Sequence, residues 1–261
     1  MRTVFVGDVH GCLDELKALV VKLDLAKGDT MVFLGDLVDR GPDPVGVVRY
    51  VRALTLAAVF GVRRIKGNHE EKALRWLRHE DKVAAGKQTK NPMKEVPAGR
   101  QAEWKGLSVE DRAFLADAPL VLEFDIGSEH WVAVHGGFLP GRSPADQVRK
   151  HADEIIRCRW VNAEGKHVGM VAGSKEMPPG SFPWMERFDG KFHVVCGHAV
   201  HGTEKPRVDK TVAGFEVWSI DTGCYGGGRL TALSIDHDTL AREVVQVQAA
   251  REYFPLNADG S

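Results

Sequence analysis

The sequence predicts an α/β fold in which β-α-β units surround a parallel or mixed sheet. Over the first seventy residues, short apolar runs alternate with helical patterns, as is typical of such units. Each of the three apolar runs there also ends in a cluster of Gly, Asp, His or Asn. Because ligands of open α/β sheets bind beyond the carboxyl ends of the strands, one crevice can collect all three clusters.

The elements of this first part follow in order. Residues 3–6 are apolar and predict a buried strand, and the leucines of residues 13–23 fall on one face of a helix. Asp43 is placed to cap a second helix that begins at Pro44. The second and third strands are expected at residues 31–34 and 62–65.

The pattern weakens over residues 82–107 into Lys, Gly, Gln, Asn and Pro, which predicts a mobile, lid-like insertion rather than a second domain. Ser108 and Asp111 then form a capping box for a short helix. Further strands are expected at residues 119–124, 131–134, 193–196, 215–220, 230–235 and 243–247, with a surface loop at 177–183. We therefore expect a single domain over residues 1–250 and a C-terminal tail over 251–261.

Composition excludes some classes of partner. The chain of 261 residues has 35 basic and 36 acidic side chains, so no overall field attracts nucleic acid or an anionic membrane. The four cysteines (Cys12, Cys158, Cys196 and Cys224) form no C-x-x-C pair, which argues against a zinc knuckle and a disulfide framework. No apolar window approaches a membrane span. We expect a soluble, cytoplasmic protein with reduced thiols.

The polar clusters have the chemistry of a metal site. Asp8 and His10 alternate on an extended segment, so the carboxylate and the imidazole can point to the same side. Mixed oxygen and nitrogen ligands suit Mn²⁺, Fe, Zn²⁺ or Co²⁺ better than the all-oxygen sites of Mg²⁺ and Ca²⁺. Further candidate ligands end other apolar runs: Asp36, Asn68, His135 and His198.

Five blocks of this sequence resemble those of the calcineurin-like metallophosphoesterases, specifically the phosphoprotein phosphatase branch. The blocks are GDxHG at residues 7–11, GDxVDRG at 35–41, GNHE at 67–70, HGG at 135–137 and GH at 197–198. The resemblance extends from residue 3 to about residue 235. It implies that family's fold, a central β-sandwich of mixed sheets flanked by helices, and a hydrolase of phosphate esters or phosphoanhydrides.

The resemblance also implies two divalent metal ions that activate a water molecule. We expect Mn²⁺, with Fe, Zn²⁺ or Co²⁺ as alternatives, and Asp36 as the ligand that bridges the two ions. The family's pattern assigns Asp8, His10 and Asp36 to one ion, and Asp36, Asn68, His135 and His198 to the other.

The same pattern implies roles for residues beside the metals. His69 would donate a proton to the leaving oxygen, with Asp39 holding its imidazole in the correct tautomer, although Asp39 could instead only cap a turn. Arg40 would bind phosphate oxygens through its guanidinium. A second arginine is expected from Arg157 or Arg159, which alternation would place on one face. Either of these two could instead be a surface charge.

The C-terminal half most resembles bacterial symmetrical diadenosine tetraphosphate hydrolases, which release two ADP. The similar segments are residues 157–160, 197–198 and 220–230. Some dinucleotide hydrolases, however, have Ala and Asp where this chain has Asp39 and Glu70, so these two positions resemble a protein phosphatase. A protein serine/threonine phosphatase is therefore the alternative, and an inactive binding module is a third hypothesis. Four aromatic residues could stack on adenine, although most of them are expected to fill the core: Trp104, Trp160, Trp184 and Tyr225.

Overall fold

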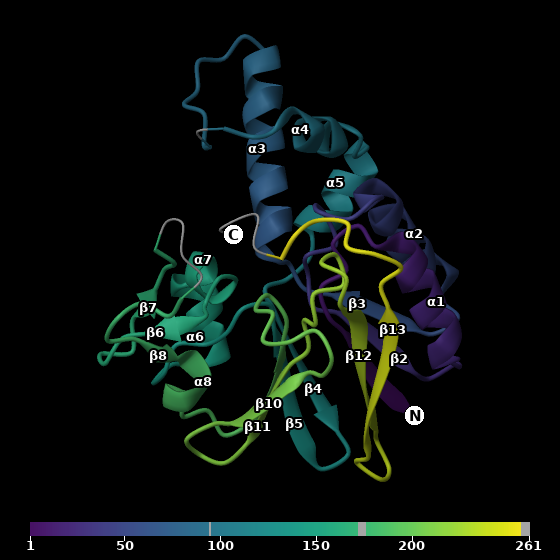
Figure 1. Ribbon diagram of the computed structural model, residues 1–261, viewed down its shortest axis with the longest axis vertical. Helices are drawn as coiled ribbons and strands as arrows, with labels where there is room; N and C mark the ends of the chain where they lie inside the picture. The colour runs from purple at the N-terminus through teal and green to yellow at the C-terminus, as the bar shows by residue number, and fades with distance from the viewer. Residues whose placement is uncertain (94, 172–175, 257–261) are drawn as a thin grey trace.

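The computed structural model describes residues 1–93, 95–171 and 176–256. Two five-stranded sheets pack face to face, and helices cover both outer faces (Figure 1). The interior between the sheets is apolar and includes Phe5, Val32, Trp131 and Val195. The expected sandwich of mixed sheets is therefore confirmed.

The first sheet has the strand order β13-β12-β1-β2-β3. Strands β1, β2 and β3 are parallel to one another. Strand β12 pairs antiparallel with β1, and β13 pairs antiparallel with β12. The helices between the parallel strands supply the crossovers that parallel pairing requires. The bounds are β1 (Arg2–Val6), β2 (Thr30–Phe33), β3 (Gly61–Arg64), β12 (Arg229–Asp236) and β13 (Arg242–Gln248).

The second sheet has the order β10-β11-β9-β5-β4, and a small third sheet has the order β7-β6-β8. The strands of the second sheet are β4 (Val121–Ile126), β5 (Glu129–Val134), β9 (His193–Cys196), β10 (Arg207–Lys210) and β11 (Glu216–Ser219). Those of the third are β6 (Trp160–Val161), β7 (His167–Val168) and β8 (Phe182–Pro183), so the predicted loop at 177–183 ends in a short strand.

Helices α1 and α2 lie against the first sheet, and α6, α7 and α8 lie beside the second (Figure 1). The predicted caps are present: Asp43 accepts the Gly46 N–H at 2.8 Å, and Ser108 and Asp111 form a reciprocal box. The bounds are α1 (Leu13–Leu23), α2 (Pro44–Ala57), α3 (Asn68–Ala84), α4 (Ala98–Lys105), α5 (Val109–Ala116), α6 (Pro144–Lys150), α7 (Ala152–Ile155) and α8 (Trp184–Arg187).

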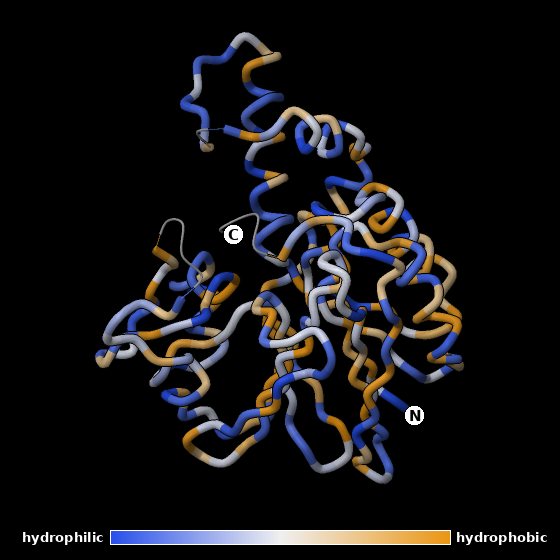
Figure 2. Tube along the Cα trace, in the orientation of Figure 1, coloured by the Kyte–Doolittle hydropathy of each residue, from blue (hydrophilic) through white to orange (hydrophobic). Residues whose placement is uncertain are grey.

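The predicted insertion at 82–107 is irregular only in its first part. Helix α3 projects from the sandwich, and the chain that follows it returns to α4, which packs beside α3 through the buried Trp104 (Figure 1). The rings of Trp104 and Trp76 are 5.6 Å apart. This difference arises because a single large side chain anchors α4, whereas the surrounding residues are polar (Figure 2).

The start of the predicted tail packs on the domain. The backbone N–H groups of Tyr253 and Phe254 donate to the carbonyl of Tyr225 at 2.9 and 3.1 Å. Leu256 packs against the hydrophobic core that the first sheet forms with α1 and α2. Residues 257–261 lie outside the described residues. In the described part of the chain, no helix has the length and apolar character needed to cross a membrane.

Candidate active site

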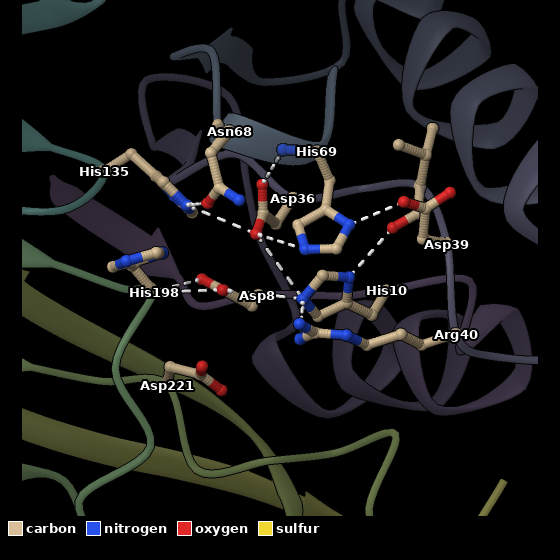
Figure 3. A network of polar contacts seen from close by, with 12 residues as sticks. Asp8, His10, Asp36, Asp39, Arg40, Asn68, His69, His135, His198 and Asp221 are labelled. Atoms are coloured by element: carbon tan, nitrogen blue, oxygen red, sulfur yellow. Dashed lines mark hydrogen bonds and ion pairs between the residues drawn. The ribbon is translucent and has the colours of Figure 1, made fainter. Parts of the chain in front are cut away.

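The predicted metal ligands come together at one end of the sandwich (Figure 3). They belong to segments that follow five strands, which brings residues distant in the chain into one site. All of them are buried: Asp8, His10, Asp36, Asn68, His135 and His198. The sequence therefore predicted the convergence of these side chains correctly, although their roles as ligands remain proposals.

Asp36 lies at the centre of the cluster. Its Oδ2 atom is 3.3 Å from His135 Nε2, 3.5 Å from His10 Nε2 and 3.9 Å from His69 Nε2. Asp8 Oδ2 approaches His10 Nε2 at 3.8 Å and accepts the backbone N–H of His198 at 3.1 Å. A carboxylate oxygen surrounded by imidazole nitrogens in this way has the surroundings of a candidate metal ligand.

Two backbone carbonyls fix the orientation of the inward-facing imidazoles. His10 Nδ1 lies 2.8 Å from the carbonyl of Val38, and His135 Nδ1 lies 2.7 Å from that of Leu34. With Nδ1 donating its proton, Nε2 of the neutral ring presents its lone pair to the cluster, as in metal-bound histidines. Without a metal ion, a proton on His135 Nε2 can bridge to Asn68 Oδ1, which lies 3.0 Å away. A metal ion would replace that proton, and the two carboxylates, one amide oxygen and three imidazoles present here are ligands that fit such an ion.

The charges of the cluster also favour a cation. Burial and the nearby carboxylate of Asp221 raise the pKa of Asp8 well above its ordinary value. Burial alone would raise the pKa of Asp36 as well, but the imidazoles of His135 and His69 hold it well below the usual range. Burial opposes a charge on His135, yet the carboxylates of Asp36 and Asp8 raise its pKa to about 10. Buried carboxylates thus draw positive charge into this site.

His69 and Asp39 form the pair that the resemblance implied. His69 Nδ1 lies 2.6 Å from Asp39 Oδ2, so Nε2 faces the cluster (Figure 3). The indole N–H of Trp104 donates to Asp39 Oδ1 at 2.6 Å, and Arg100 Nε lies 3.8 Å from Oδ2. Burial lowers the pKa of His69, although Asp36 opposes this shift. Asp39 therefore orients an imidazole rather than only capping a turn.

The arginines occupy different positions. Arg40 Nη1 lies 2.8 Å from His10 Nε2, and its guanidinium covers the ring of Tyr225 at 4.4 Å. Arg159 donates from Nε to His198 Nε2 at 3.2 Å. A metal ion held by His198 would therefore bind the other ring nitrogen, Nδ1. Burial lowers the pKa of Arg159.

Arg157 does not share a face with Arg159, contrary to the expectation from alternation. Residues 156–157 form a turn after α7 instead of a strand. Arg157 Nη1 donates to the carbonyl of Asp153 at 3.0 Å, and its side chain borders a second pocket of about 280 Å³ whose lining also includes Asn68 and His198. The two arginines therefore line different pockets, and Arg159 alone of the two donates to a proposed metal ligand, His198, in the hydrogen bonds given above.

Sequence reasoning assigned no role to two buried carboxylates of this site. Glu70 accepts the backbone N–H groups of Asp36, Leu37 and Gly67 at 2.8, 2.7 and 2.8 Å, and so fixes the loop that carries Asp36. Burial and the charge of Asp36 raise the pKa of Glu70 to about 7. Asp221 follows β11, and its Oδ2 has no hydrogen-bond partner among the described residues. The position of Asp221 just after a strand was the signal in the sequence that could have identified it as a site residue.

A cavity of about 420 Å³ opens beside the cluster. Its lining includes Arg40, Arg159, His198 and Tyr225 at the metal end, and Trp160, His201 and Arg207 elsewhere. Three guanidinium groups and the aromatic side chains of Trp160, Trp184 and Tyr225 therefore border one hollow. Such a lining is suited to an anionic ligand that also carries a ring.

Comparisons with known proteins agree with this geometry. Residues 1–202 match the family described as calcineurin-like phosphoesterase. The chain is 32% identical to the asymmetrical bis(5'-nucleosyl)-tetraphosphatase PrpE of Bacillus velezensis, with 91% of each chain covered. It is 27% identical to a symmetrical bis(5'-nucleosyl)-tetraphosphatase of Yersinia pestis, with 90% of each covered.

Solved structures share the fold. One assigned provisionally as a diadenosine tetraphosphatase has a TM-score of 0.68 at 23% identity, over 94% of this chain and 93% of the other. A Saccharomyces cerevisiae protein serine/threonine phosphatase has a TM-score of 0.58 at 15% identity, over 96% and 81%. Together with the family match over residues 1–202, this makes the chain a member of the calcineurin-like metallophosphoesterase family, and hence a hydrolase.

Proposed function

We propose that this enzyme hydrolyses dinucleoside tetraphosphates, with symmetrical cleavage of diadenosine tetraphosphate to two ADP as its principal reaction. The observation that carries the proposal is the cavity beside His198, where Arg40, Arg159 and Arg207 border one hollow with Trp160 and Tyr225. Guanidinium groups bind phosphate oxygens through a planar array of donors. Aromatic side chains offer faces on which a nucleobase can stack.

We propose that Asp8, His10, Asp36, Asn68, His135 and His198 hold two divalent metal ions, with Mn²⁺ as the expected metal. Bound there, the ions would lower the pKa of a water molecule and neutralise phosphate charge. Within this arrangement, Arg40 and Arg159 would orient the phosphate. His69, protonated on both ring nitrogens, would give its Nε2 proton to the leaving oxygen, while Asp39 would accept the Nδ1–H and stabilise that imidazolium.

The main test uses Mn²⁺-loaded enzyme with diadenosine tetraphosphate or a phosphoserine peptide, with products separated by chromatography. The proposal predicts faster turnover of the dinucleotide, with ADP as the product. Related enzymes bear both symmetrical and asymmetrical names, so the identity of the product is informative. Release of ATP and AMP would refute symmetrical cleavage, and faster turnover of the peptide would refute the substrate class.

Arg207 permits a sharper test of the cavity. It lies at the outer part of the lining, where Asp209 pairs with its Nε at 2.7 Å. Arg207→Ala should raise KM for the dinucleotide but leave KM for nitrophenyl phosphate unchanged, because the smaller substrate does not extend that far. Arg63→Ala, at an exposed position of β3 outside the cavity lining, is the matched control. Equal effects of Arg207→Ala on both substrates would contradict the proposed binding mode.

A protein serine/threonine phosphatase is the second candidate. The observation that favours it is the pairing of Asp39 with His69, together with Glu70, since these residue types resemble the protein phosphatases of the family. The competition between peptide and dinucleotide described above distinguishes the two. An inactive binding module would hold both metals and turn over neither substrate.

A further inference from the structure

A second group of potential metal ligands lies behind the active site, on the side of α1. Cys12 precedes α1, Glu15 lies in the first turn of that helix, and Cys224 lies in the connection from β11 to β12. The three side chains are 0, 4 and 1% exposed. One ligand atom from each, the two Sγ atoms and a carboxylate oxygen, lie within 4.8 Å of one another. None of the three takes part in the proposed reaction.

Glu15 brings a carboxylate into this group with one oxygen unsatisfied. Its Oε1 accepts the Ala250 N–H at 3.0 Å and the Tyr253 hydroxyl at 2.8 Å. Its Oε2 is buried and has no hydrogen-bond partner in residues 1–93, 95–171 and 176–256. A buried charge of this kind normally pairs with a cation or binds a metal. The free oxygen therefore points to a missing positive charge.

Two acidic groups beside Glu15, the Cys224 thiol and the Tyr253 phenol, have raised pKa values. The hydrogen bond with the Cys12 thiol, burial and the charge of Glu15 all raise the pKa of Cys224. Burial and the hydrogen bond to Glu15 raise the pKa of Tyr253 to about 12. Both groups therefore stay neutral, and the negative charge that a cation would balance here is that of the Glu15 carboxylate, whose Oε2 is buried without a partner among the described residues.

We propose that Cys12, Glu15 and Cys224 bind one thiophilic divalent ion of the zinc type. Two thiolates and a carboxylate are ligands that Zn²⁺ accepts, and three protein ligands leave one tetrahedral position for a small ligand. Binding displaces the two thiol protons to solvent. Thiolates select softer ions than the oxygen and nitrogen ligands of the Asp36 cluster do. The two kinds of site therefore prefer different metal ions.

The position of this ion gives it a structural role. It would join the start of α1, which directly follows the His10 loop, to the connection that carries Asp221 and Tyr225. Through the hydrogen bond from Tyr253 to Glu15, it would also join the C-terminal segment. The ion would thereby hold in place two loops that border the active site without touching the substrate.

Cobalt spectroscopy of the reduced, full-length protein tests this site independently of activity. Thiolate bound to Co²⁺ gives a charge-transfer band in the near ultraviolet. Among the groups of candidate metal ligands in the described part of the chain, the proposed site alone contains cysteine, so we expect the band to come from that site. Titration of Mn²⁺-loaded protein with Co²⁺ should give a band that saturates at one equivalent of thiolate-bound cobalt. Zn²⁺ should then abolish the band by displacing Co²⁺.

Matched variants locate the ligands. Cys12→Ser and Cys224→Ser should each remove the band, whereas Cys158→Ala, which alters another buried thiol, should retain it. Glu15→Gln keeps both thiols and should weaken Co²⁺ binding at least tenfold; circular dichroism checks that each variant is folded. No band in wild-type protein with its thiols shown to be reduced would overturn the proposal. So would a band that persists in Cys12→Ser and Cys224→Ser, or unchanged affinity in Glu15→Gln.

Discussion

The change His69→Asn separates two functions that the structure allows for this histidine. As a proton donor, His69 depends on Asp39, which lies 2.6 Å from its Nδ1. As a metal ligand, it would act with His10 and Asp36, since these three residues form a group able to hold an ion. We expect the first function, because the five other candidate ligands surround Asp36 without it.

The expected loss can be estimated from the chemistry. General acid catalysis contributes roughly 10²–10⁴-fold, which corresponds to about 3–5.5 kcal/mol of transition-state stabilisation. His69→Asn should therefore lower kcat on phenyl phosphate by roughly that factor. The loss should be much smaller on nitrophenyl phosphate, because nitrophenolate departs without a full proton transfer. KM should change little, because Arg40 and Arg159 still bind the phosphate.

Steady-state kinetics on both esters, with metal analysis of the same sample, provide the assay. The variant should retain the metal content of the wild type. Equal losses on the two esters would refute proton donation by His69. Loss of one metal ion per chain would instead identify this residue as a ligand. Asp39→Asn serves as the companion variant and should reproduce the dependence on the leaving group.

Three further predictions concern other parts of the molecule. Asp36→Asn should lose bound metal and activity together, as measured by elemental analysis and turnover, and activity near wild type would exclude a bridging role. Trp104→Phe leaves the buried Asp39 Oδ1 without its donor, so the free energy of unfolding in urea should fall by about 1–3 kcal/mol, with a lower kcat. In the folded protein the pKa of Asp29 lies below its ordinary value of 3.8, because hydrogen bonds, first among them that from Arg2, outweigh burial. The stabilisation that the Asp29 carboxylate gives the fold is therefore present above pH 3.8 and is lost as the pH falls through the lower pKa of the folded state. Asp29→Asn should accordingly destabilise at neutral pH and much less at about pH 3.

The sequence was most informative where local pattern and chemistry coincide. Apolar runs ending in Asp8, Asp36 and Asn68 predicted both the parallel strands and the edge at which the site lies, because strand direction determines where each run ends. The histidines His135 and His198 were predicted for the same reason, although their strands belong to the second sheet.

The backbone of the site was less predictable. His10, Asp36, Asp39, Arg40 and His198 all have φ between 44° and 70° in the described chain, a region that residues other than glycine seldom adopt. Such conformations cluster at functional sites because the surrounding structure must maintain them. Here Glu70 supplies part of that support through the backbone N–H groups around Asp36, a role that sequence position alone does not reveal.

Trp104 changes how the segment after α3 should be understood. Its polar sequence predicted a mobile lid, whose effect would be confined to the substrates that it covers. The indole N–H of Trp104, however, donates a hydrogen bond to Asp39, the residue that orients the proposed proton donor His69. Changes that displace α4 should therefore weaken proton donation to every poor leaving group, large or small. In contrast, a segment acting only as a lid would affect the dinucleotide and spare phenyl phosphate, so comparing these two substrates in Trp104→Phe distinguishes the two roles.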